Sequence, residues 1–174
     1  MIASKNMNIH IPTLRSTRLI LRAIRADDHE RLFAMAHDPE VTRHLNEGPP
    51  PTEGEVWQRM TFALGHWVLR GYGMMIVEDQ EGFVGRLGVH HPYGDPDPQL
   101  SYILCRRSWG RGYASEGVAL IRDWMFLTHR PRRLVSHIAR DNAASARVAS
   151  KLGAVRGGTT DQTGVILDIW VYSP

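Results

Sequence analysis

Alternation of polar and apolar residues predicts strands in several parts of the chain. The segment TRLILRAI, residues 17–24, alternates with the period of a half-buried strand. Two apolar runs, 73–78 and 82–90, flank a short turn at 79–81 and predict a hairpin. The other predicted strands cover 99–105, 134–139, 154–160 and 165–172, with a turn near Thr163-Gly164 between the last two.

Helical periodicity fills most of the segments between these strands. In the helix predicted over 113–128, four apolar residues recur every three or four positions and share one face: Ala114, Val118, Ile121 and Met125. The other predicted helices are 27–37, capped by Asp27; 53–70, with a capping box of Thr52 and Glu55 and a stop at Gly71; and a short helix that follows Asp141 or Asn142 and stops at Gly153. The strand–helix–strand unit over 99–139 needs a parallel crossover, whereas the hairpins need antiparallel neighbours. We therefore expect a mixed sheet with helices on its faces.

Composition indicates one globular domain over residues 1–174, with 43% hydrophobic and 22% charged residues. No apolar run approaches the roughly 20 residues of a membrane span, and the first ten residues lack the apolar core of a signal peptide. The single cysteine, Cys105, excludes an internal disulfide framework and fits a reducing cytosol. We therefore expect a cytoplasmic protein with no membrane partner.

Arginine supplies nearly all of the positive charge, since only Lys5 and Lys151 are lysines among 21 basic residues. This excess fits codon bias as well as binding of phosphate, carboxylate or nucleic acid. The stretch RRSWGRGYASEG, residues 106–117, places three arginines and three glycines between a predicted strand and a predicted helix. Unpaired N–H groups at the start of a helix attract anions, and glycines let an anion approach closely, so this turn is a candidate phosphate site. It matches neither the lysine-bearing nucleotide loop nor the dinucleotide fingerprint, and an incidental tight turn is the alternative.

Three segments in register resemble the GNAT acyltransferases. Arg107, Gly110 and Gly112 match the signature R/Q-x-x-G-x-G/A, and ARDNAASARVASKLGA, residues 139–154, resembles the second motif, written N-x-x-S…LEKLGF. The opening TLRSTRLILRAIRADDHERLFAMAHDPEVTRHL and the later HWVLRGYGMMIVE resemble the RimJ/RimL-type branch. The resemblance implies an α/β (α+β) fold with a mixed, mostly antiparallel twisted sheet, a splayed central parallel pair and helices on both faces. It also implies an N-acetyltransferase that uses acetyl-CoA and no metal.

The resemblance further implies roles for individual residues. Coenzyme A would lie in the gap of the splayed pair, with its pyrophosphate on the N–H groups of 107–112 and its pantetheine arm along 102–105. The implied coenzyme residues are Tyr102, Ile103, Leu104, Cys105, Arg107, Trp109, Gly110, Arg111, Gly112, Tyr113, Ala114, Asn142 and Ser145. A main-chain N–H near Tyr102–Ile103 would donate to the oxyanion, Ser145 would protonate the thiolate, and Asn142 would both cap its helix and bind pantetheine. Trp67 and Tyr72 are expected to line the acceptor pocket.

The general base stays open at this level. Many relatives carry a glutamate where this chain has Gln99, which cannot take a proton at neutral pH. Asp168, on the last strand, is the first candidate, and an acid paired with an arginine is its structural alternative. His91 or its neighbour His90, which point to opposite faces of a strand, and an ordered water chain are the others. Cys105 as an acyl carrier is disfavoured because an isolated buried cysteine is usually inert.

The favoured acceptor is a protein or peptide N-terminus. Its α-amine has a reference pKa of about 7.7–8.0, against about 10.4 for lysine, and so needs less help from a base. A small amine is the alternative acceptor, and a homodimer is left open. Two further readings are a coenzyme-binding module without turnover, suggested by the missing glutamate, and a nucleic-acid binder, suggested by the arginine excess. The second is disfavoured because the arginines form no periodic stripe with exposed aromatics. The histidines show no zinc-ligand spacing.

Overall fold

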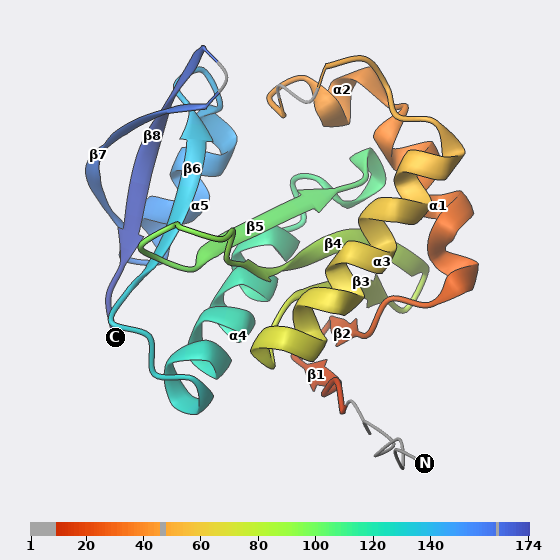
Figure 1. Ribbon diagram of the computed structural model, residues 1–174, viewed down its shortest axis with the longest axis horizontal. Helices are drawn as coiled ribbons and strands as arrows, with labels where there is room; N and C mark the ends of the chain where they lie inside the picture. The colour runs from red at the N-terminus through yellow and green to blue at the C-terminus, as the bar shows by residue number, and fades with distance from the viewer. Residues whose placement is uncertain (1–9, 46–47, 163) are drawn as a thin grey trace, which may run out of the picture.

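Eight strands form a single sheet in the computed structural model, which describes residues 10–45, 48–162 and 164–174 (Figure 1). The strand order is β1-β2-β3-β4-β5-β6-β8-β7. Among the described residues, β5 and β6 run parallel and the other neighbours are antiparallel, which confirms the expected mixed sheet. The strands are β1 (Leu14–Arg15), β2 (Ile20–Arg22), β3 (Met74–Asp79), β4 (Gly82–His90), β5 (Gln99–Leu104), β6 (Leu134–Ala139), β7 (Val155–Gln162) and β8 (Val165–Tyr172).

Helices cover both faces of this sheet (Figure 1). They are α1 (His29–Ala36), α2 (Pro39–Thr42), α3 (Glu53–Arg70), α4 (Tyr113–Thr128) and α5 (Ala143–Lys151), with 3₁₀ turns η1 (Ala26–Asp28) and η2 (Arg106–Ser108). Because side chains alternate along a strand, β3 serves two cores: Met74 and Ile76 pack with residues of α1 and α3, whereas Met75 and Val77 belong to the core that includes α4. Within the described residues, no helix is long and apolar enough to cross a membrane.

Local capping determines where α3 and α5 begin. The Thr52 hydroxyl accepts from the Glu55 N–H, the Glu55 carboxylate accepts from the Thr52 N–H, and Gly71 takes a left-handed φ of 75° after the last turn. The predicted capping box and stop are therefore confirmed. In α5 the Asn142 side chain accepts from the Ser145 N–H at 3.0 Å, so Asn142 is the cap rather than Asp141.

The N-terminal predictions need correction. Of the strand expected over 17–24, only Ile20–Arg22 forms one, because the chain turns at 16–19, where the Ser16 N–H donates to the Leu19 carbonyl. The short strand β1 precedes this turn and was not predicted. Asp28, not Asp27, holds the start of the first helix: its buried carboxylate accepts from the Arg22 guanidinium at 2.7 and 2.8 Å and from the Arg25 N–H at 2.8 Å. Helix α2 and turn η2 were not predicted.

The sheet opens between β5 and β6. The two strands pair only at Gln99 with Val135, and they diverge beyond this point (Figure 1). The next β5 carbonyl that faces β6 belongs to Leu100. It accepts a hydrogen bond from the buried Ser136 hydroxyl at 2.8 Å instead of from a main-chain N–H. At the far end of the sheet, Gly164 has a φ of 85°, as the turn predicted between the last two strands requires; Thr163 lies outside the described residues.

Candidate functional site

A cavity of about 530 Å³ lies at the opening of the sheet, bounded by β5, the glycine turn, the first turn of α4, helix α5 and the segment around α2. All of the predicted coenzyme residues line it except Cys105, Arg107 and Arg111. One space therefore brings together the two segments that the sequence motifs singled out.

The phase of the β4–β5 ladder determines which main-chain groups face this cavity. Leu104 lies opposite Gly85, and the Cys105 N–H donates to the Val84 carbonyl at 2.9 Å. In an antiparallel ladder this arrangement turns the Ile103 N–H toward β4 and the N–H groups of Tyr102 and Leu104 toward the gap. Of the two main-chain N–H groups expected to donate to the oxyanion, only that of Tyr102 faces the gap. Ile103 lines the cavity with its side chain.

The glycine turn leaves the start of α4 uncapped. Gly110 and Gly112 have φ values of 71° and 79°, in the left-handed region where glycine is preferred. Gly112 occupies the N-cap position and offers no side-chain acceptor, so the first-turn N–H groups of Tyr113, Ala114 and Ser115 have no partner within the helix. These three residues line the cavity. The geometry provides an anion site built from main-chain N–H groups and the positive end of the helix dipole.

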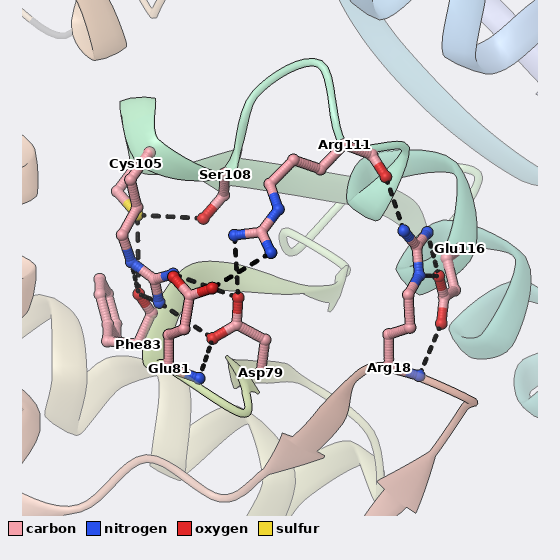
Figure 2. Close-up of polar contacts among 9 residues, drawn as sticks. Arg18, Asp79, Glu81, Phe83, Cys105, Ser108, Arg111 and Glu116 are labelled. Atoms are coloured by element: carbon pink, nitrogen blue, oxygen red, sulfur yellow. Dashed lines mark hydrogen bonds and ion pairs between the residues drawn. The ribbon is translucent and has the colours of Figure 1, made fainter.

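Arg107 and Arg111 do not line the cavity but pair with acids of the β3–β4 turn. Figure 2 shows Arg111 beside Asp79 and Glu81. Arg107 donates to both oxygens of Asp79, at 3.1 and 3.2 Å, and to the Phe83 carbonyl. Arg111 lies 3.3 Å from Glu81 and 3.6 Å from Asp79. The Asp79 carboxylate is only 3% exposed. Burial raises its pKa, but hydrogen bonds from Arg107 and from the Glu81 N–H outweigh this and leave the pKa below its usual value.

A second ion pair holds the other end of the turn. Arg18 donates to the Glu116 carboxylate at 2.7 Å and to the Arg111 carbonyl at 2.9 Å (Figure 2). Glu116 also accepts from the Ser16 hydroxyl at 2.6 Å. Burial raises the Glu116 pKa, but the hydrogen bonds from Ser16 and Arg18 outweigh this effect and leave the pKa below its usual value, so the group stays ionised. The glycine turn is therefore anchored on its outer side at both ends.

Other basic side chains line the cavity itself. Arg43 is paired with Glu40, and His44 lies 3.3 Å from Asp141. Two further cations stand one turn apart on α5: Arg147 and Lys151. Within the described part of the chain neither has a carboxylate partner. Sequence reasoning overlooked this pair, although both residues lie inside the quoted second motif.

Hydrogen bonds join Asn142, Ser145 and Tyr102 in the lining of the cavity. The Asn142 carbonyl oxygen caps α5, which confirms the capping half of its expected dual role and leaves its amide NH₂ able to donate. Its contact with pantetheine stays a prediction. The Tyr102 hydroxyl lies 3.4 Å from the Ser145 carbonyl oxygen, and burial raises the pKa of Tyr102 to about 12. Tyr102 is therefore a neutral hydrogen-bond donor at physiological pH.

Two of the residues predicted as catalytic lie elsewhere. Asp168 does not line the cavity; its carboxylate is bonded to Arg156 and lies 3.5 Å from Arg140, which matches its structural alternative. His91 has both ring nitrogens occupied, Nδ1 by the Tyr72 hydroxyl at 3.1 Å and Nε2 by the Asp95 carbonyl at 2.8 Å.

His90 faces the opposite side of the strand and lines a neighbouring cavity of about 500 Å³ together with Ser101 and Arg86. It stands directly across from Gln99, the position where the resembling family carries glutamate. Burial lowers the pKa of His90 to about 4, and the nearby His66 and Arg86 act in the same direction. The imidazole is therefore neutral at pH 7, with a lone pair available to accept a proton.

The remaining predicted residues are occupied in the core. Trp67 is 3% exposed and donates from Nε1 to the Met74 carbonyl at 3.0 Å. Tyr72 is also buried and holds His91, so the structure brings neither residue to the cavity. Cys105 lies against Ser108 and the Phe83 carbonyl, outside the cavity lining. Among the described residues, no group of three or more His, Cys, Asp or Glu side chains could hold a metal ion.

Comparison with known proteins identifies the family. Residues 18–155 match the model of the acetyltransferase (GNAT) domain. YoaA, an uncharacterised N-acetyltransferase of Bacillus subtilis, is 30% identical over 169 residues, which cover 93% of this chain and 96% of YoaA. A crystal structure of an acetyltransferase from Agrobacterium tumefaciens aligns with a TM-score of 0.84 at 28% identity, over 98% of this chain and 99% of that one. RimL, a ribosomal α-N-protein acetyltransferase in complex with coenzyme A, shares the fold with a TM-score of 0.78 at 20% identity, over 94% and 97% of the two chains. The chain belongs to the GNAT acetyltransferases.

Proposed function

We propose that this chain transfers the acetyl group of acetyl-CoA to an α-amine, both substrates being bound at the same time. The observation that carries the proposal is the opening of the sheet beside an uncapped helix. Main-chain N–H groups of β5 and of the first turn of α4 line one cavity of about 530 Å³. This volume lies within the range of small-molecule sites.

The coenzyme is oriented by its charged end. The N–H groups of Tyr113, Ala114 and Ser115 bind the pyrophosphate. Arg147 and Lys151 supply the positive charge, because Arg107 and Arg111 are paired with carboxylates of the protein. The pantetheine arm then runs toward the point where β5 and β6 meet. It passes the Leu104 N–H first and brings the thioester to Tyr102, at the inner end.

The chemistry follows from the groups at that end. The amine nitrogen attacks the thioester carbonyl carbon; a C–N bond forms and the C–S bond breaks. The Tyr102 N–H donates to the carbonyl oxygen as it becomes negative. The Ser145 hydroxyl gives a proton to the departing thiolate and recovers one from solvent, and the proton lost by the amine passes through water to His90.

An α-amine suits this arrangement better than a lysine does. With a pKa of about 7.7–8.0, an N-terminal amine is substantially deprotonated near neutral pH, whereas lysine is not. A neutral imidazole with a pKa of about 4 is a weak base, and it is sufficient only for an acceptor that needs little help.

A binding assay and a turnover assay together test the proposal. Calorimetry should show binding of coenzyme A, and acetyl-CoA should release thiol in the presence of a peptide with a free N-terminus, with the acetylated peptide detected by mass. Binding without thiol release from any peptide, polyamine or aminoglycoside would favour a non-catalytic coenzyme module. Absence of coenzyme binding would refute the site itself.

A further inference from the structure

A third cavity, of about 300 Å³, lies on the α1–α3 side of the sheet. We call it the apolar cavity. Its walls include Ile24, Leu32, Met35, Val56, Met60 and Met74, and the three consecutive prolines Pro49–Pro51 stand at its edge. Four basic residues also line it: His37, Arg43, Arg59 and Arg86. Most of these hydrophobic walls are buried. No reaction step described above uses this space.

The apolar cavity adjoins the coenzyme cavity. Val41, Arg43, Leu45 and Ile103 line both. Ile103 follows directly on Tyr102, whose N–H is the proposed oxyanion donor, and its side chain points to the opposite face of β5. A group that enters the apolar cavity therefore ends beside the carbonyl carbon that the amine must attack.

The position dictates which part of the acceptor enters. The atoms bonded closest to the amine must occupy the space next to Ile103. Ile103 belongs to one core cluster with Leu32, Met35, Val56, Met60 and Met74, so an apolar group that enters among these side chains gains by leaving water, whereas a polar group would lose its hydration. An acidic side chain is the competing occupant, because Arg43, Arg59 and Arg86 also line the cavity. The rest of the acceptor can extend toward the cavity lined by His90, which adjoins the apolar cavity. The two cavities share Arg59, Ala63, Met74 and Arg86.

We infer that the acceptor is an α-amine whose own residue carries a bulky apolar side chain, of the size of leucine, methionine or phenylalanine. The apolar cavity holds this side chain, and the remainder of the acceptor extends toward His90. This inference rests on the proposed acetyl transfer to an α-amine and specifies the acceptor class of the same site.

A peptide series tests the inference without any variant. The peptides share one sequence and differ only in the first residue, which is glycine, alanine, leucine, methionine, phenylalanine, aspartate or lysine. One methylene in an apolar pocket changes selectivity by about tenfold or more, so kcat/KM for the leucine, methionine or phenylalanine peptide should exceed that for the glycine peptide at least tenfold. Equal rates across the series, or a best rate with glycine, aspartate or lysine, would overturn the inference. So would acetylation of the other peptides and of none of the apolar ones, whereas absent coenzyme binding, or binding with no acetylation of any peptide, would refute the proposed function instead.

Filling the cavity provides the complementary test. Ala63 is buried on α3 and lines the apolar cavity, so Ala63→Leu should lower kcat/KM for the leucine and phenylalanine peptides at least tenfold. The KM for acetyl-CoA should change little, and the glycine peptide should lose less than the bulky peptides, because Ala63 also borders the cavity that receives the rest of every acceptor. Ala34→Leu, on the exposed face of α1, is the matched control and should leave the whole series unchanged.

If Ala63→Leu does not fold, enlarging the cavity gives the opposite shift. Val56→Ala removes two methyl groups from the wall and should move the optimum from leucine toward phenylalanine. An unchanged order of peptides in a folded Val56→Ala variant would also count against this assignment.

Discussion

Replacing Gly112 tests whether main-chain conformation creates the anion site. Gly112 is the N-cap of α4 with a φ of 79°. An added Cβ would meet only the Arg18 Nη2, at 3.5 Å, which is an ordinary contact. The cost of Gly112→Ala is therefore conformational: about 1–2 kcal/mol for a left-handed L-residue, or roughly 2–8 °C in Tm.

The loss of coenzyme affinity should exceed this loss of stability. When the alanine relaxes toward a negative φ, the first-turn N–H groups turn away from the pyrophosphate. Each charge-assisted hydrogen bond contributes about 1.5–3 kcal/mol, so losing one weakens binding roughly 10- to 150-fold. Calorimetry with coenzyme A measures this directly.

Two further variants separate conformation from size. Gly153 has a φ of 80° just after α5 and does not line the coenzyme cavity, so Gly153→Ala should lose similar stability and keep its affinity. Asparagine tolerates the left-handed region, so Gly112→Asn should bind coenzyme better than Gly112→Ala despite its larger side chain. If the asparagine variant binds worse than the alanine variant, the reasoning from φ is refuted and steric blocking takes its place.

Four further variants test the remaining assignments. Asp79→Asn should raise the KM for acetyl-CoA more than it lowers kcat and cost about 1–2 kcal/mol of stability; because the folded pKa is lowered, the wild-type advantage should be full above about pH 4 and disappear as the pH falls through the folded pKa. Replacing Arg147 and Lys151 together by alanine should weaken coenzyme binding about tenfold at low salt and less at high salt; a salt-independent effect would contradict a charge role. Asp168→Asn should cost about 1 kcal/mol and leave the pH–rate profile unchanged, and a loss of kcat with intact stability would restore it as the base. The low folded pKa of His90 means that wild-type stability should be full above about pH 6.5 and fall toward pH 4, as the unfolded chain takes up its proton first; urea unfolding of His90→Gln should show a weaker fall.

Local signals carried most of the fold prediction. Helix α3 was predictable because Thr52, Glu55 and Gly71 act within a few residues of its ends, and α4 because its apolar face repeats over sixteen residues. Helix α2 was not, since four residues are too short for a periodic pattern. The sequence did not predict that Asp28 stabilises the start of the first helix, because its partner Arg22 lies on another element.

The site was predictable only where the main chain acts. The glycines at 110 and 112 and the cap at Asn142 are local features, and the structure puts all three in one cavity. The orientation of a side chain depends on residues far away in the sequence. Adjacent residues such as His90 and His91 face opposite sides of a strand, and only the assembled sheet determines which of them meets a cavity.

Arg107 and Arg111 are a second case in which the sequence does not reveal where a side chain points. A cluster of arginines beside a glycine turn suggests direct contact with phosphate, but the acids of the β3–β4 turn take up Arg107 and Arg111 on the outer side. This arrangement has a physical advantage. A turn whose glycines leave it conformationally free needs external anchors to present its N–H groups in one direction, and ion pairs on the outer face supply them without filling the cavity. In the proposed site the phosphate charge is met by Arg147 and Lys151 of α5, a separate element, so the shape of the turn and the charge of the site could be altered independently.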